Sequence, residues 1–68
     1  MKILRWVNKY SGETGYVKSV LKSKGYFVNV WEREGAKTYM NETMALKDIE
    51  LLKTMGEAEN NVFYVEDK

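Results

Sequence analysis

Two residue types that often carry chemistry are missing from this sequence of 68 residues, because it contains neither cysteine nor histidine. Without cysteine, no disulfide and no thiolate metal site can form, and imidazole ligands are absent as well. The same absences exclude thiol chemistry and histidine acid–base catalysis, which leaves carboxylates, lysine, serine and tyrosine as candidate groups. We therefore expect no metal site and no cofactor.

Long hydrophobic runs are also missing. No apolar run approaches the ~20 residues that a transmembrane helix requires. At the N-terminus, Lys2 and Arg5 interrupt the stretch in which a signal peptide would need its apolar core. The absence of cysteine fits a reducing compartment. These features predict a cytoplasmic protein that does not associate with a membrane.

The short length leaves room for one small globular domain, residues 1–68, with one modest core. Cores of this size supply roughly 3–5 kcal/mol of stability. Neither a disulfide nor a cysteine or histidine metal site can add to that figure. Self-association remains as a further source of stability, so a homodimer is among the states we consider.

One segment, residues 41–56, has the pattern of a helix. Asn41 is a suitable N-cap, Glu42 places a negative charge at the positive end of the helix dipole, and Gly56 supplies a left-handed residue at the end. Apolar residues recur at helical spacing along one side. They are Ala45, Ile49 and Leu52, flanked by Met44, Leu46, Leu51 and Met55. Such a wide stripe predicts packing against a sheet.

The remaining segments have strand patterns. Residues 2–10, 16–21, 26–33 and 62–65 are predicted strands, residues 11–15 a glycine-bracketed turn, and residues 36–40 favour a short additional strand. The predicted fold class is α+β: an antiparallel meander of three to four strands, one helix packed on one face, and a closing C-terminal strand, in the order β-β-β-(β)-α-β. Only residues 66–68 are expected to fray.

Three segments carry a resemblance to known proteins. They are residues 15–20 (GYVKSV), residues 25–28 (GYFV), and residues 36–45 before the closing apolar strand. In these segments the chain resembles short uncharacterised proteins of Gram-positive bacteria and their phages. The resemblance implies an origin in a prophage or an accessory gene, and it implies no catalytic residue.

Candidate catalytic groups lack a supporting neighbourhood. Glu32 and Glu34 flank Arg33 beside a glycine and resemble a paired-carboxylate site, although a solvated turn explains them better. The glycine turn at residues 12–15 lacks the lysine and the following helix of a phosphate-binding loop. We therefore predict that the protein is not an enzyme.

Aromatic and basic residues gather in the first part of the chain. Residues 1–31 carry a net charge of +5, whereas residues 32–68 carry −4. This asymmetry indicates either a basic binding face or strands and a helix that attract each other. One helix covers only one face of a sheet, so some of the nine aromatic rings are expected on the other face, at an edge or in a contact with another chain. The candidate binding surface comprises Arg5, Lys9, Tyr16, Lys18, Lys22, Lys24 and Tyr26.

Two functions fit this surface. The first is a non-enzymatic interaction module, such as a phage or mobile-element accessory protein, that binds a host protein through its sheet. The alternative is single-stranded nucleic-acid binding by the basic, aromatic N-terminal hairpins. Dedicated nucleic-acid modules are usually strongly basic, and the net charge here is only +1. The charge favours a protein partner.

Overall fold

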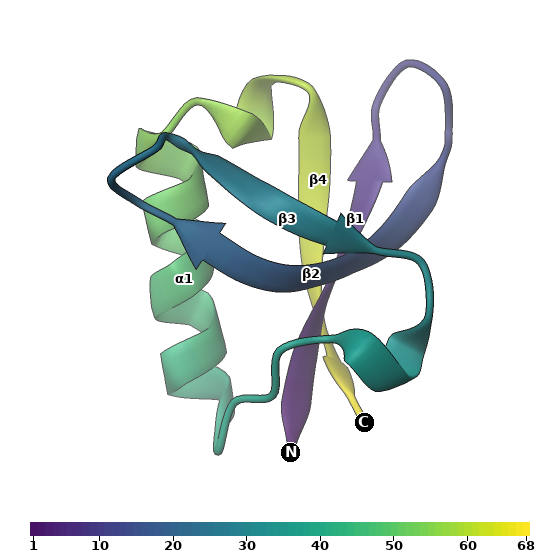
Figure 1. Cartoon of the computed structure of the whole chain (residues 1–68), viewed down its shortest axis with the longest axis vertical. Helices are drawn as coiled ribbons and strands as arrows, with labels where there is room; N and C mark the ends of the chain where they lie inside the picture. The colour runs from purple at the N-terminus through teal and green to yellow at the C-terminus, as the bar shows by residue number, and fades with distance from the viewer.

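Four antiparallel strands form a single sheet in the order β3-β2-β1-β4 in the computed structural model, which describes residues 1–68 (Figure 1). The strands are β1 (Lys2–Asn8), β2 (Thr14–Leu21), β3 (Tyr26–Val30) and β4 (Asn61–Asp67). The first three follow one another as a meander, and β4 returns to the free edge of β1. The predicted α+β fold class is confirmed.

The helix α1 (Glu42–Thr54) lies against one face of the sheet, as predicted. The side-chain oxygen of Asn41 accepts a hydrogen bond from the Met44 amide at 3.0 Å. Beyond the other end, Gly56 adopts a left-handed conformation with φ 87°. The residues of α1 that are buried are Ala45, Ile49 and Leu52.

The core fills the space between α1 and the sheet. Buried side chains of the sheet, Leu4, Trp6 and Val17, join Tyr39 and the three buried helix residues in one cluster. Partly buried residues complete it: Val20, Phe27, Phe63 and Val65. Burial of this apolar surface is the main term that favours folding. We call this side of the sheet the covered face and the opposite side the open face.

Two strands end earlier than predicted. β1 stops at Asn8 because the Asn8 side-chain oxygen accepts the amides of Tyr10 and Ser11, each at 2.9 Å, and turns the chain. β3 stops at Val30 and is followed by the 3-10 turn η1 (Arg33–Gly35). A second 3-10 turn, η2 (Glu57–Glu59), follows α1. Residues 36–40 do not form a strand, although Tyr39 exchanges two 2.8 Å backbone hydrogen bonds with Lys2.

The C-terminus is ordered rather than frayed, contrary to prediction. Glu66 and Asp67 belong to β4, and the Lys68 amide donates to the Met1 carbonyl at 3.0 Å. The two chain ends therefore lie together, as Figure 1 shows. No helix of the structure combines the length and the apolar character needed to cross a membrane.

Candidate functional site

The centre of the open face is a row of three residues that lie side by side on neighbouring strands. Arg5 of β1 pairs with Tyr16 of β2 on one side and with Tyr64 of β4 on the other. Successive side chains of a strand alternate between the two faces. Because Leu4 and Trp6 belong to the core, Arg5 and its two tyrosine neighbours project from the open face.

Glu66 connects two arginines at this row. Its carboxylate accepts from Arg5 Nε at 2.6 Å and from Arg33 Nη1 at 3.0 Å. The Arg5 guanidinium lies 4.8 Å from the centre of the Tyr64 ring, and that of Arg33 lies 5.9 Å from the centre of the Tyr16 ring. Both distances allow a cation–π attraction. We call these five residues the arginine–tyrosine cluster.

The carboxylate of Glu66 is held in its charged form by the cluster. The hydrogen bond from Arg5, and then that from Arg33, lower the pKa of Glu66 below its usual value, against the opposing effect of burial. The side chain is 29% exposed. An ionised carboxylate between two guanidiniums fixes both of them, so the cluster is arranged by contacts within the fold.

Arg33 reaches the cluster because residues 31–40, which follow β3, cross one end of the open face. We call these residues the crossing segment. The Lys37 amide donates to the Val17 carbonyl at 2.9 Å along this crossing. Ile3 lies on the open face, since it alternates with Leu4, yet it is fully buried, and Ala36 is buried as well. Both lie outside the main core cluster. The crossing segment thus closes this end of the face and leaves the rest exposed.

Apolar side chains continue the open face around the cluster. The register places them on the side opposite Trp6 and Phe27. Exposed fractions are 37% for Val62, 44% for Tyr64 and 46% for Tyr26. The half-buried members are Val7, Leu21, Val28 and Val30. A mixed surface of tyrosine, arginine and aliphatic side chains is typical of protein interfaces.

The structure brings together only part of the predicted surface. Arg5 and Tyr16 are neighbours, whereas Tyr26 lies near the far end of β2, because it pairs with Leu21 while Tyr16 pairs with Val30. Both tyrosines lie near the start of a strand, but antiparallel strands start at opposite ends of a sheet. Lys9 is remote from the row, since its Nζ donates to the Ala58 carbonyl at 2.7 Å.

The other predicted lysines surround the second hairpin. Lys22 and Lys24 are exposed in the turn between β2 and β3, and Lys18 is exposed at a β-bulge in β2. None of the three forms an ion pair within the chain, whereas Lys2 and Arg5 pair with Asp67 and Glu66. The charge asymmetry of the sequence is therefore partly used to hold β1 against β4.

Three cluster members were missing from the predicted surface. Tyr64 could have been found, because it lies in a predicted strand and alternates with Phe63, which packs against the core. Arg33 and Glu66 carried no comparable signal. They are 33 residues apart in the sequence and meet only when the crossing segment and β4 reach the same end of the sheet.

Three carboxylates in or near the segment that follows β3 have different surroundings. Glu32 and Glu34 are exposed on either side of Arg33, which turns to Glu66. Asp48 of α1 accepts a hydrogen bond from the buried Tyr39 hydroxyl and pairs with Lys37 at 3.1 Å. Burial, and then this hydrogen bond, raise the pKa of Tyr39, so the hydroxyl keeps its proton. Through these two contacts, Asp48 connects α1 to residues 36–40.

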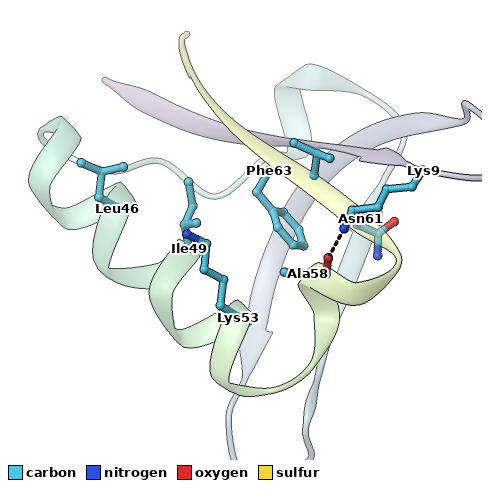
Figure 2. Close-up of a pocket in the computed structure, with 8 residues that line it drawn as sticks. Lys9, Leu46, Ile49, Lys53, Ala58, Asn61 and Phe63 are labelled. Carbon is cyan, nitrogen blue, oxygen red and sulfur yellow. Dashed lines mark hydrogen bonds between the residues drawn. The ribbon is translucent and has the colours of Figure 1, made fainter.

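A pocket lies between α1 and β4 (Figure 2). Its volume is about 390 Å³. Its lining is mostly apolar and includes two lysines; it comprises Lys9, Leu46, Ile49, Lys53, Ala58, Asn61, Val62 and Phe63. We call it the edge groove.

The molecule therefore offers two features for binding, the open face with its arginine–tyrosine cluster and the edge groove. No group of three or more acidic side chains is placed to hold a metal ion. Comparisons with protein-family models, with curated proteins and with solved structures found no match to this chain.

Proposed function

We propose that this protein is a non-catalytic interaction module that binds a protein partner through the open face of its sheet. The observation that carries the proposal is the arginine–tyrosine cluster, in which Glu66 holds two arginines over two exposed or half-buried tyrosines. Tyrosine and arginine are enriched among the residues that dominate binding energy at interfaces. The cluster places both types at the centre of an aliphatic surface.

The chemistry of the face also supports a particular kind of partner surface. Two arginines and one glutamate leave one net positive charge, and each guanidinium has donors beyond those given to Glu66. The matching surface is apolar with a carboxylate that approaches the arginines. The resemblance to short phage-related proteins makes a bacterial host protein the first partner class to test.

Nucleic-acid binding is the second candidate, and it is favoured by Lys18, Lys22 and Lys24, which are exposed and free of ion pairs. Two features weigh against it. Glu66 competes with phosphate for both arginines, and Tyr26 lies near the far end of β2 from Tyr16, so the two rings do not form one stacking platform. Salt dependence separates the candidates, since three phosphate contacts on a single strand give a log–log slope of about −2.

The test is affinity capture from the lysate of the source organism with the wild-type protein and two variants. Tyr64→Ala removes an exposed ring of the cluster. Tyr10→Ala is the matched control, because Tyr10 is 79% exposed but lies in the turn after β1. We expect a protein that is retained by wild type and Tyr10→Ala and lost by Tyr64→Ala, with the same result after nuclease treatment.

Anisotropy titration with a labelled mixed-sequence oligonucleotide completes the test. We expect no binding at low salt up to about millimolar protein, the weak limit of specific association. Binding with a slope near −2 that disappears when Lys18, Lys22 and Lys24 are replaced by glutamine would establish the nucleic-acid function instead. A captured protein that both tyrosine variants retain equally would show that the open face is not the binding surface.

A further inference from the structure

The outer edge of β4 has unpaired backbone groups. At the ends of the β1–β4 pair, the Lys9 amide donates to the Asn60 carbonyl and the Lys68 amide donates to the Met1 carbonyl. Bonded and non-bonded pairs alternate in an antiparallel ladder. Val62, Tyr64 and Glu66 therefore direct their backbone groups toward β1. Those of Phe63 and Val65 point away from the sheet, where no further strand lies beside β4.

The edge groove runs along this open edge. Val62 and Phe63 project from opposite faces of β4, and both line the groove, so it reaches around the edge of the strand. The opposite wall consists of Leu46, Ile49 and Lys53 of α1, as Figure 2 shows. Leu46 is 45% exposed. An unpaired strand edge is a template for another strand. Here it is combined with an apolar wall that can receive side chains.

The charges of the groove are positive at one end. Lys53 lies in the last turn of α1 and Lys9 is bonded to Ala58 of η2, so both stand where β4 begins. No acidic residue lines the groove. Glu57 and Glu59 flank Ala58 outside the lining, and Glu50 lies 3.7 Å from Lys53 Nζ while being 72% exposed. A carboxylate at this end would meet two ammonium groups.

We propose that the edge groove binds the extended C-terminal segment of a protein, which adds to β4 as an antiparallel strand. An antiparallel strand beside β4 ends where β4 begins, so its terminal carboxylate lies next to Lys9 and Lys53. Alternate side chains of the segment face the apolar wall of α1, and its backbone pairs with Phe63 and Val65. Strand addition combines backbone affinity with side-chain pockets in this way. This site is separate from the open face and does not depend on the function proposed above.

Labelled peptides of sequence KKTVTLTX, in which X is valine, leucine or phenylalanine, provide the test. Each is prepared with a free C-terminal carboxylate and as the C-terminal amide, and binding is followed by anisotropy. We expect at least one free acid to bind about tenfold more tightly than its amide, a difference of about 1.4 kcal/mol. Equal binding of acid and amide, or no binding of any peptide up to about millimolar, would overturn the proposal.

Variants locate the carboxylate. In the double variant Lys9→Gln with Lys53→Gln, we expect the acid and the amide to bind within about twofold of each other. Lys47→Gln is the matched control, because Lys47 is an exposed lysine of α1 outside the groove, and it should keep the full discrimination. If the double variant also binds the acid more tightly than the amide, the terminal carboxylate does not lie beside Lys9 and Lys53.

Amide spectra test the strand pairing and separate this site from the open face. Peptide binding should shift the Phe63 and Val65 amides more than the Tyr64 amide, whose hydrogen bond to β1 is already formed. Arg33→Ala, which alters the arginine–tyrosine cluster, should bind the peptide as wild type does. Shifts confined to the open face would contradict strand addition at β4. If the capture experiment finds no partner for the open face but the peptides bind as described, only the proposed function fails and the groove proposal stands.

Discussion

The two faces of one sheet differ in burial and in residue type, although both are built from alternate residues of the same strands. On the covered face, Leu4, Trp6 and Val17 are buried under α1 and contribute to a single apolar cluster. On the open face, Arg5 and Tyr16 belong to a charged and aromatic cluster that stays partly in contact with solvent. Covered-face positions therefore contribute most of the apolar burial that stabilises the fold, whereas most open-face positions remain partly exposed to solvent.

The difference also shows how the open face can be preorganised at little cost to folding. Its two arginines both pair with the same carboxylate, and no buried side-chain nitrogen or oxygen of the structure lacks a hydrogen-bond partner. Buried polar groups without partners would destabilise the fold by about 1–3 kcal/mol each. A face of this kind stays exposed to solvent without such a penalty.

The largest loss of stability should come from shortening a buried side chain on the covered face. Leu52 is fully buried, so Leu52→Ala should lower the free energy of unfolding by about 2–5 kcal/mol. Tyr64→Ala on the open face should cost no more than about 1 kcal/mol, the range of an exposed cation–π contact or a cross-strand pair. Denaturant melts measure both. Similar losses for the two variants would remove the distinction between the faces.

Adding a methyl group on the covered face should also destabilise the protein more than adding one on the open face. Gly15 of β2 lies opposite Trp6 on the covered face, beneath the 2.6 Å hydrogen bond from Trp6 Nε1 to Asn29 Oδ1. A Cβ at Gly15 would stand 2.9 Å from Trp6 Nε1 and closer still to Asn29 Oδ1. Gly15→Ala should therefore cost about 1–3 kcal/mol, as overpacking does, and should change the tryptophan emission.

Ser19→Thr is the control for Gly15→Ala. It adds one carbon to the same strand on the open face, where Ser19 pairs with Val28. We expect a change within about 0.5 kcal/mol and an unaltered emission spectrum. If Gly15→Ala is tolerated as well as Ser19→Thr, the covered face has more free space at Trp6 than the contacts indicate.

The sequence was sufficient where local patterns decide the structure. Asn41, Gly56 and the apolar stripe of α1 are local signals, and they predicted the helix and its buried residues correctly. Gly15 shows the limit of such signals. It was interpreted as a turn residue, whereas it is buried in β2 because the Trp6 indole crosses that position.

The candidate site was less predictable because it depends on contacts between distant segments. Residues 66–68 were expected to fray, yet Glu66 is held by Arg5 and Arg33, which are 61 and 33 residues away. Likewise, Tyr16 and Tyr26 were grouped by their positions at strand starts, and the antiparallel register separates them. Long-range ion pairs and register leave no trace in a local pattern.

The smallest effect should come from the carboxylate that organises the open face. The pKa of Glu66 is lowered in the folded protein by its hydrogen bonds to Arg5 and Arg33. A carboxylate of lowered pKa contributes stability that is present above its unfolded value, near 4.3, and is lost as the pH falls through the folded value. Stability should thus decrease below about pH 5, in part because Glu66 becomes protonated.

Glu66→Gln should make that decrease shallower, because the variant has no charge to lose at this position. At neutral pH it should cost about 1 kcal/mol or less, the range for partly exposed ion pairs. Asp67, whose pKa is lowered by its hydrogen bond from Lys2, remains in the variant and keeps part of the pH dependence.

Glu13→Gln is the control, since Glu13 is exposed and forms no ion pair, and it should leave the pH profile of the unfolding free energy closer to wild type. A Glu66→Gln profile as steep as that of wild type would mean that the arginines do not hold this carboxylate in solution. The open face would then have to be arranged by its partner on binding rather than by the fold.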